Sequence, residues 1–404
     1  MDKAERRGAT SWSGSRRRNG ALWNGAIAAV VVSAILMGCT DGTTSPRAPT
    51  PSPPSLSPPL SPPPSPPPPP SSPPGLIQVL TLITYDGSGQ AVHPDAVRTA
   101  AGWGGLSSSN LVVTPYPRGQ ASYENPSVFI GQSATVWEVP DGVQNPIAQP
   151  VAEGYLSDPD ELYNPTTNEL WLYYRQVTTQ NQILMIRSSD GVHWSVPVTV
   201  ISVPNHEAVS PTVVRMNETD WRLWAVNSGA DGCTALSTTV ELRTSADGIQ
   251  WSAPQTVSLG DQEDFPWHMD VSWIPAYHQF WAVYNAKVAG SCTTGVLRFA
   301  TSPDGIHWTT APTPLLSRGA IPEFSDIVYR ASLQYDAASD NVTLWYSGAS
   351  YKTSAYEWHV AVQQISRKSM LAFVMQQPTA SSSIRSDKVP VTSQPPALTN
   401  ATAP

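Results

Sequence analysis

The heptapeptide Ser188-Ser189-Asp190-Gly191-Val192-His193-Trp194 recurs twice further along the chain in nearly the same form. The two later copies are Ser245-Ala246-Asp247-Gly248-Ile249-Gln250-Trp251 and Ser302-Pro303-Asp304-Gly305-Ile306-His307-Trp308. Successive copies end 57 residues apart, and a degenerate copy that ends at Trp137 precedes the first at the same spacing. A period of this length is typical of propellers and other repeat architectures. The repeat therefore predicts a β-propeller.

Each copy stands between two strand-like segments, and its Asp-Gly pair is typical of a tight hairpin turn. In such a turn the Asp carboxylate accepts backbone N–H groups, and the Trp packs the hairpin onto its sheet. We therefore interpret these acidic turns as structural rather than catalytic. They resemble a shortened form of the Asp-box found on sialidase propellers.

Apolar strands ahead of the turns indicate five blades. The five segments are 111–114, 170–174, 223–226, 280–284 and 344–346. We expect an all-β, five-bladed propeller of four-stranded antiparallel blades over residues 76–366. Because a propeller ring has to close, we expect residues 76–84 to pair with the last blade beside residues 358–365. Residues 370–375 are the alternative closing segment.

The starts of the innermost strands are the predicted functional region. In a four-stranded blade the first strand lines the central channel, and the repeated turns lie on the face opposite its start. The five starts therefore gather around one mouth of the channel, and an ionisable residue stands at every one. These segments are Val92-His93-Pro94-Asp95, Ser157-Asp158-Pro159-Asp160, His206-Glu207-Ala208-Val209-Ser210-Pro211, Trp267-His268-Met269-Asp270 and Tyr329-Arg330-Ala331-Ser332.

Five blades with Asp, Asp and Glu at successive strand starts resemble glycoside hydrolase family 43, the arabinanase and β-xylosidase type, over about residues 76–366. The resemblance implies inverting hydrolysis of glycosidic bonds, in which water attacks between two carboxyl groups ~6.5–9.5 Å apart. It makes Asp160 the carboxylate that tunes the acid's pKa, Glu207 the general acid and Asp95 the general base. Two positions depart from the family: Glu207 stands farther before Pro211, and the family's first Asp-Pro is His93-Pro94 here.

Other polar and aromatic side chains expected at this mouth are predicted to bind substrate. They are His93, Asp158, Asn125, Arg175, Trp267, His268, Asp270, Asn285 and Arg330. Trp267 suits the C–H face of a sugar, since aromatic rings line concave ligand sites. His268 and Asp270 could bind ligand or a central metal ion. We expect no required cofactor, with a central Ca²⁺ as an option, because the sequence has no Cys and His cluster with zinc spacing.

Two other functions fit the same residues. A carbohydrate-binding or adhesion propeller without catalysis would explain why His93-Pro94 replaces the family's Asp-Pro. A sialidase-like enzyme is suggested by the turns, but it would need three clustered Arg and a Tyr nucleophile, and only Arg330 and Arg175 are in place. The formal net charge of −8 argues against nucleic acid as a partner.

The N-terminal region predicts export. Basic residues, including Arg16 to Arg18, precede an apolar run over residues 21–37, as in a secretory signal. Leu36-Met37-Gly38-Cys39 resembles a bacterial lipobox, which implies a signal peptide over residues 1–38 and a lipid on Cys39. An uncleaved membrane anchor is the alternative. Either way we expect an extracytoplasmic protein held at a bacterial membrane, facing the periplasm or the cell surface.

The remaining segments extend this prediction. Residues 39–75 are rich in Pro and Ser, which favours an extended polyproline II tether. Residues 367–404 are expected to form a disordered tail. Cys233 and Cys292 fall in corresponding hairpins of adjacent blades, and export exposes them to oxidising conditions, so we predict a disulfide between them.

Overall fold

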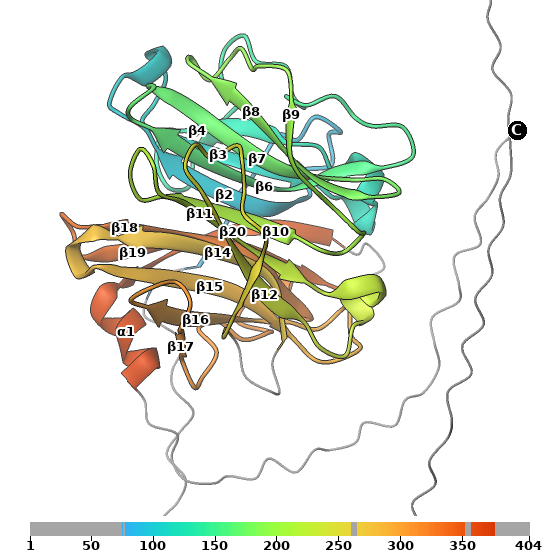
Figure 1. Ribbon diagram of the computed structural model, residues 1–404. Helices are drawn as coiled ribbons and strands as arrows, with labels where there is room; N and C mark the ends of the chain where they lie inside the picture. Colours follow the sequence, from blue (N-terminus) through green and yellow to red (C-terminus); the bar gives the residue numbers. More distant parts are fainter. Residues whose placement is uncertain (1–74, 76, 260–264, 352–356, 376–404) are drawn as a thin grey trace, which may run out of the picture. The chain divides into compact units, whose positions relative to one another are not determined.

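The computed structural model describes residue 75 and residues 77–259, 265–351 and 357–375. In these parts the chain forms five antiparallel sheets of four strands each (Figure 1). The innermost strands contact one another in a closed cycle, from β2 to β6, β10, β14, β18 and back to β2. The predicted all-β, five-bladed propeller is confirmed.

Each of the first four blades runs through its strands in chain order from the channel outward. Blade 1 contains β2 (Ala91–Arg98), β3 (Ser109–Pro115), β4 (Ser127–Gly131) and β5 (Trp137–Glu138). Blade 2 contains β6 (Tyr155–Asn164), β7 (Glu169–Val177), β8 (Asn181–Ser188) and β9 (Val198–Val203). Blade 3 contains β10 (Val209–Arg215), β11 (Trp221–Asn227), β12 (Thr239–Ser245) and β13 (Gln255–Val257). Blade 4 contains β14 (Phe265–Ile274), β15 (Gln279–Lys287), β16 (Val296–Ser302) and β17 (Thr309–Thr310).

The fifth blade closes the ring with a strand from the other end of the chain. It contains β18 (Ile327–Asp336), β19 (Asn341–Ser350), β20 (Glu357–Ser366) and β1 (Gln78–Val79). Gln78 pairs with Val362 and Val79 with Ala361. Closure by the N-terminal segment is therefore confirmed. The alternative segment belongs instead to the helix α1 (Arg367–Met375), whose Met370 is buried in the core shared by blades 4 and 5.

The repeated turns have the structural role that the sequence predicts. Asp190 Oδ1 accepts the backbone N–H groups of Val192 and His193 at 2.9 and 2.8 Å. These bonds and the His193 side chain hold the pKa of Asp190 below its usual range, although burial opposes them. The turns also join neighbouring blades, because the carbonyl of Gly248 in blade 3 accepts the Tyr173 hydroxyl of blade 2 at 2.8 Å.

The hydrophobic core is divided among the interfaces between blades. Strand residues are buried on both faces, as β11 illustrates with Trp221, Leu223, Trp224, Ala225 and Val226. Trp224 of blade 3 packs against Phe280 of blade 4, with ring centroids 5.2 Å apart. Buried sheets read as apolar runs for this reason. Both faces of each blade pack against neighbouring blades. The polar side chains of the inner strands therefore lie in the central channel.

Loops and short 3₁₀ helices connect the strands. These helices are η1 (Trp103–Gly105), η2 (Pro117–Gly119), η3 (Ala121–Tyr123), η4 (Gly229–Thr234), η5 (Pro275–Tyr277) and η6 (Pro322–Phe324). A disulfide joins Cys233 in η4 to Cys292 in the loop between β15 and β16, as predicted. It therefore ties blade 3 to blade 4 on the side of the channel where the inner strands begin.

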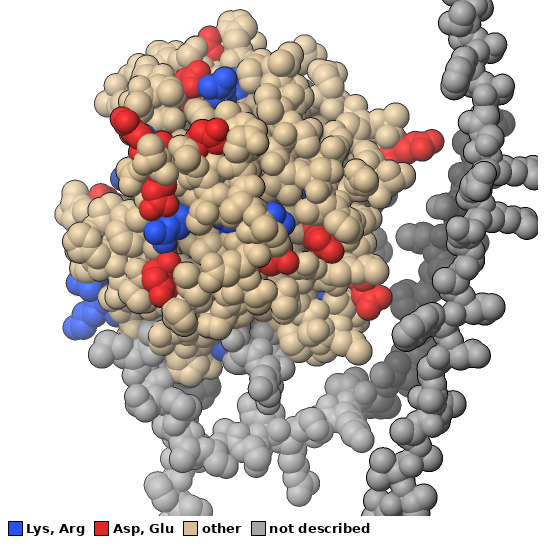
Figure 2. Space-filling model, viewed as in Figure 1, with Lys and Arg blue, Asp and Glu red and all other residues tan. Residues whose placement is uncertain are grey.

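Several predictions concern residues outside the described parts of the chain. These are the signal peptide, the lipidated Cys39, most of the tether and the tail beyond α1. Among the described residues, no helix has both the length and the apolar character needed to cross a membrane. On the face seen in Figure 2, charged side chains are few and both signs are interspersed.

Candidate functional site

Each innermost strand begins with a local irregularity. The register of pairing shifts between Val92 and Asp95 in blade 1 and between Ser157 and Asp160 in blade 2, and blade 3 shifts at the equivalent place. Blades 4 and 5 shift nearby, between Pro266 and His268 and between Val328 and Ala331. In the first three blades the shift contains a residue followed by Pro. That residue is His93, Asp158 or Ser210, with φ of 54°, 51° and 52°. Positive φ is strained for residues other than Gly, and bulges re-aim side chains beside functional sites.

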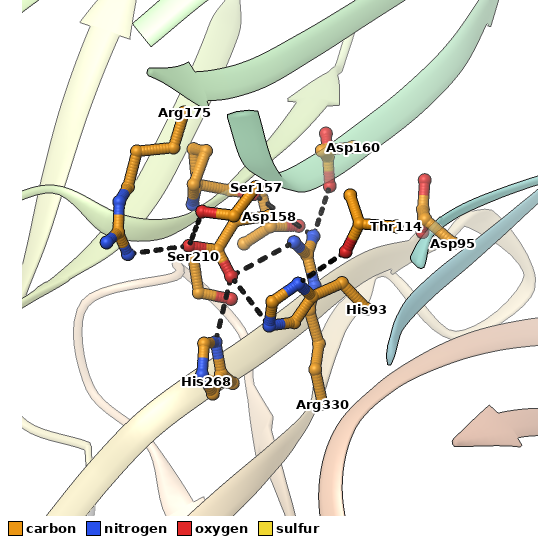
Figure 3. A network of polar contacts seen from close by, with 12 residues as sticks. His93, Asp95, Thr114, Ser157, Asp158, Asp160, Arg175, Ser210, His268 and Arg330 are labelled. Carbon is orange, nitrogen blue, oxygen red and sulfur yellow. Dashed lines mark hydrogen bonds and ion pairs between the residues drawn. The ribbon is translucent and has the colours of Figure 1, made fainter. Parts of the chain in front are cut away.

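The irregularity creates two layers of side chains in the channel, two residues apart on every inner strand. We call the first the mouth layer, which consists of His93, Asp158, Ser210, His268 and Arg330. We call the second the ring layer, which consists of Asp95, Asp160, Thr212, Asp270 and Ser332. Figure 3 shows members of both layers.

Every side chain of the ring layer accepts a backbone N–H from the next blade. The hydrogen bonds from Glu161 N to Asp95, from Val213 N to Asp160 and from Leu333 N to Asp270 measure 2.6, 2.8 and 2.8 Å. Those from Val271 N to Thr212 and from Ala96 N to Ser332 both measure 3.1 Å. The five bonds form a closed circuit around the channel. The ring layer thus satisfies buried backbone donors that the radial arrangement of sheets leaves unpaired.

In the mouth layer, Asp158 is the centre of the contacts. Its Oδ2 accepts Arg175 Nη1 at 2.7 Å, while its Oδ1 lies 3.0 Å from His268 Nδ1 and 3.4 Å from His93 Nε2 (Figure 3). Arg330 Nη1 lies 3.9 Å from the same oxygen. Asp158 has no exposed surface. A buried carboxylate is thus surrounded by two imidazoles and two guanidinium groups.

Glu124 and Tyr329 complete this surrounding. Glu124 Oε2 lies 3.3 Å from His93 Nδ1, which also contacts Thr114 Oγ1 at 3.0 Å. The Tyr329 ring packs edge-on against His268, with centroids 4.2 Å apart. Glu124 is buried and Oε2 has no hydrogen-bond partner among the described residues.

Burial and charge set the protonation of these groups. Burial lowers the pKa of both His93 and His268, although Asp158 opposes the shift. Burial alone would raise the pKa of Asp158, but His93, His268 and Arg175 hold it well below its usual range. Burial raises the pKa of Glu124 against the opposing effect of His93. The centre therefore combines neutral imidazoles with an ionised carboxylate.

The mouth layer opens into a pocket of about 270 Å³. Buried polar residues described above, His93, Glu124, Asp158, Arg175 and His268, line it together with several aromatic rings. The aromatic lining consists of Tyr116, Tyr155, Trp267, Tyr329, Tyr351 and Trp358. Both cysteines of the disulfide and His206 also line the pocket. A concave pocket with convergent polar groups and aromatic walls is typical of a small-ligand site.

The ring layer faces a different cavity, of about 490 Å³, which is lined by Asp95, Asp160 and Asp270. One carboxylate oxygen from each lies within 4.8 Å of the others. Burial, then the charge of Asp270, raises the pKa of Asp95 to about 7, and burial and Asp95 raise the pKa of Asp160 well above its usual value. The guanidinium group of Arg330, a mouth-layer residue, reaches the ring layer, where Nη2 lies 3.7 Å from Asp160 Oδ1.

The structure brings together five of the predicted site residues in the pocket. They are His93, Asp158, Arg175, Trp267 and His268. Asp95, Asp160 and Asp270 lie in the ring layer instead. Arg330 of the mouth layer is buried and contacts Asp158 and Asp160 rather than the pocket. Asn125 donates to the Tyr85 hydroxyl at 2.9 Å and Asn285 to the carbonyl of Val328 at 2.5 Å, so both tie segments together beside the pocket.

Glu207 does not line the pocket among the described residues. It precedes β10, is half-buried, and its charge acts on Arg243 of β12. Its carbonyl accepts the side-chain amide of Asn181. The structure therefore does not bring Glu207 together with Asp95 and Asp160, as the resemblance to family 43 implies it should.

Glu124, Tyr155 and Tyr329 are among the pocket residues that were not assigned a role from sequence. Tyr155 belongs to none of the repeated sequence patterns. Its hydroxyl accepts a hydrogen bond from Arg175 Nη2 at 3.1 Å. Glu124 stands in a loop between β3 and β4, outside the strand starts. Tyr329 adjoins the predicted Arg330, and the bulge in β18 is the feature that would have marked it.

The chemistry of the donor set fits a divalent metal ion. His93 Nε2, Asp158 Oδ1 and His268 Nδ1 are buried atoms without hydrogen-bond partners among the described residues, and the three side chains offer ligand atoms within 4.8 Å of one another. Two neutral imidazoles and one carboxylate are the ligands of many catalytic metal sites. Asp158 also receives Arg175 on its other oxygen, which fixes its orientation as outer-shell partners do.

The fold and site define a five-bladed propeller with a buried His–Asp–His centre at one mouth of its channel. No family model matches the chain. Its sequence is 30% identical over 315 residues to the A type blood N-acetyl-alpha-D-galactosamine deacetylase of Flavonifractor plautii, in a match that covers 66% of this chain and 41% of that protein. The chain thus spans only about two fifths of the length of this relative.

Solved structures give matches over the propeller. The crystal structure of an N-acetylgalactosamine deacetylase from F. plautii in complex with blood group B trisaccharide is 25% identical, with a TM-score of 0.65 over 71% of this chain and 92% of that one. The α-L-arabinanase of Penicillium chrysogenum complexed with arabinobiose is 13% identical, with a TM-score of 0.46 over 72% of this chain and 98% of that one.

Proposed function

We propose that this protein is a carbohydrate-active enzyme that removes the acetyl group from an N-acetylated amino sugar. The observation that carries the proposal is the buried centre of His93, Asp158 and His268, with Glu124 beside it, at the base of a single aromatic pocket. The similarity to a deacetylase from F. plautii supports it. A pocket of about 270 Å³ suits one sugar residue better than a long polymer segment.

In this proposal His93, Asp158 and His268 hold a divalent metal ion. When bound, such an ion supplies Lewis-acid chemistry, which polarises an amide carbonyl and makes water more acidic. Arg175 orients Asp158 through a bond of 2.7 Å and is itself contacted by Tyr155. Thr114 and Glu124 contact Nδ1 of His93, which directs Nε2 toward Asp158.

Glu124 is the proposed general base. Its Oε2 is buried, lies 3.3 Å from His93 Nδ1 and belongs to a residue that lines the pocket, where it can take a proton from the attacking water. The water oxygen adds to the amide carbon, the C–N bond breaks, and acetate leaves with that oxygen. Glu124 then returns the proton to the nitrogen, which becomes the free amine of the sugar.

Tyr329 is the proposed donor to the carbonyl oxygen of the substrate. Its hydroxyl accepts Trp267 Nε1 at 3.1 Å, so its own proton is not used in that bond. Burial raises the pKa of Tyr329 well above its usual value, which keeps the phenol protonated. A preorganised donor aimed at the developing oxyanion is a common source of rate enhancement.

The test is the release of acetate from oligosaccharides that end in N-acetylgalactosamine or N-acetylglucosamine. The proposal expects equal amounts of acetate and free amine, loss of activity after treatment with EDTA, and recovery when Zn²⁺, Mn²⁺ or Co²⁺ is added. Glu124→Gln is expected to lower kcat by about 10²–10⁴-fold, the usual contribution of a general base. Acetate release that is unaffected by EDTA and by Glu124→Gln would overturn the assignment.

A second candidate is the inverting glycoside hydrolase implied by the resemblance to family 43, with Asp160, Glu207 and Asp95 as its carboxyl groups. The cluster of Asp95, Asp160 and Asp270 beside Arg330 favours it. Its carboxylate oxygens lie within 4.8 Å, which is shorter than the gap that holds a water in such enzymes. Release of a reducing sugar without acetate would select this candidate. Binding of glycans with neither product would select the non-catalytic propeller.

We also propose, from the N-terminal sequence, that the protein is exported and carries a lipid on Cys39 at a bacterial membrane. The disulfide between Cys233 and Cys292 supports an oxidising compartment. Metabolic labelling with palmitate is expected to mark the protein and to fail with Cys39→Ala. Labelling of both proteins alike would reject Cys39 as the attachment point.

A further inference from the structure

Lys287 is a buried ammonium group that the proposed reaction does not use. It lies on β15 with 2% of its surface exposed, and burial lowers its pKa to about 8. Its Nζ donates to the carbonyl of Cys233 and stands 4.9 Å from the centre of the Trp267 ring. None of the described carboxylates forms an ion pair with it. Among the described residues, the ammonium group is therefore held by a backbone carbonyl and an aromatic face rather than by a carboxylate.

The two contacts of Lys287 connect two parts of the pocket lining. Cys233 belongs to the disulfide, and Trp267 belongs to the aromatic lining. Trp267 in turn donates Nε1 to the Tyr329 hydroxyl at 3.1 Å. Tyr329 then packs against the His268 and His93 rings at 4.2 and 5.5 Å. A continuous set of contacts therefore runs from the disulfide loop to the base of the pocket.

This set of contacts fixes where the Tyr329 proton points. Because the indole N–H occupies a lone pair of the phenol oxygen, rotation of the hydroxyl is restricted and its proton is directed away from Trp267. The indole can hold that position only if its ring does not tilt. The ammonium on its face, anchored to the Cys233 carbonyl, opposes such a tilt.

We propose that Lys287 is a positioning residue that acts through Trp267 to keep the Tyr329 hydroxyl aimed at the substrate carbonyl. The inference rests on the proposed deacetylation, in which Tyr329 stabilises the oxyanion. It assigns the disulfide loop a role in catalysis through its backbone carbonyl, at a distance from the reacting atoms.

The test compares Lys287→Met, which keeps the length of the side chain and removes its charge, with Trp267→Phe, which keeps an aromatic ring and removes the indole N–H. Each is expected to lower kcat by about tenfold with KM within about twofold, because small displacements of an aligned group reduce the rate more than the binding. Lys287→Arg is expected to recover much of the loss. Arg187→Met is the matched control, since it removes a cation 5.2 Å from the Trp171 ring, which is not part of the pocket lining.

The double variant separates a shared pathway from two independent defects. If Lys287 acts through Trp267, the double variant is expected to have a kcat within about twofold of the slower single variant. Multiplied losses would overturn the inference, as would a Lys287→Met variant with the kcat of the Arg187→Met control. Thermal unfolding of every variant identifies any loss that comes from unfolded protein.

A spectroscopic measurement tests the same contacts without activity. In the ¹H–¹⁵N spectrum of the labelled full chain, the indole signal absent from Trp267→Phe belongs to Trp267. Lys287→Met is expected to shift or broaden that signal, and Arg187→Met is expected to leave it in place. An unchanged signal in Lys287→Met would overturn the inference, whether or not the wild type releases acetate. A wild type that releases no acetate would count only against the proposed function.

Discussion

The mouth layer and the ring layer are built from the same inner strands, two residues apart, yet their polar side chains have different tasks. Ring-layer residues such as Asp160 have a backbone N–H of the next blade as partner, at 2.8 Å in this case. In the mouth layer, Asp158 is instead contacted by the side chains of Arg175, His268 and His93, although Ser210 of the same layer still accepts a hydrogen bond from Met269 N at 3.1 Å. The role of an Asp in this channel is therefore decided by whether a backbone donor reaches it.

The bulge at each strand start produces this division. A residue in the left-handed conformation, as at His93 and Asp158, turns its side chain out of the strand pairing and into the pocket. Two residues later the strand is regular again, and the side chain reaches the adjacent blade. Strain at the mouth is thus compensated by hydrogen bonds in the ring, as expected of a functional site on a rigid scaffold.

The largest expected effect separates the two layers by their chemistry. Asp158→Asn removes the charge from the proposed metal centre, and we expect kcat/KM for deacetylation to fall by at least about 10²–10³-fold. Asp160→Asn replaces a carboxyl whose pKa burial and Asp95 raise well above its usual value, so an amide is a close substitute. We expect its kcat/KM to stay within about threefold of the wild type. Steady-state rates of acetate release give both values.

The reverse order of these two variants would contradict the comparison. It would place the catalytic carboxylate in the ring layer, where the resemblance to family 43 puts Asp160. Binding of Co²⁺, followed by its absorption spectrum, provides a second measurement, because Asp158→Asn should weaken it and Asp160→Asn should not.

A smaller effect concerns stability and belongs to the ring layer. Asp270→Ala leaves the buried N–H of Leu333 without an acceptor, and we expect the free energy of unfolding to fall by about 1–3 kcal/mol. Asp270→Asn keeps an acceptor and should lose less. Urea unfolding followed by fluorescence measures both. Equal stability of Asp270→Ala and the wild type would show that the circuit of bonds does not stabilise the ring.

The difference between the layers also explains what could be predicted from sequence. The repeated turns and the apolar strands ahead of them predicted five blades, because period and strand pattern are local properties of the chain, and the need to close the ring predicted the closing strand. The same pattern brought His93, Asp158 and His268 to one mouth. It could not assign Asp95 and Asp160 to the ring, since their partners are backbone groups of Glu161 and Val213 in the next blade.

Glu124 and Glu207 show the other limit. Both are acids near a strand start or in a loop at the mouth, and nothing in their local sequence distinguishes them. The loop before β4 brings Glu124 against His93, whereas the turn before β10 leaves Glu207 beside Arg243. Only the paths of these loops in space decide which carboxylate reaches the pocket.

The smallest expected effect tests a carboxyl that belongs to neither layer. Glu161 is buried, with both carboxylate oxygens unpartnered among the described residues, and burial and then Asp95 raise its pKa well above the usual value. An acid whose pKa is raised by folding stabilises the fold at low pH, and this stability is lost as the pH rises through its folded pKa. Glu161→Gln cannot ionise, so it should match the wild type near pH 4 and become more stable at pH 8, by an amount on the order of 1–3 kcal/mol. Thermal unfolding across this range measures the difference, and a difference that is constant with pH would mean that the pKa of Glu161 is the same in the folded and the unfolded protein.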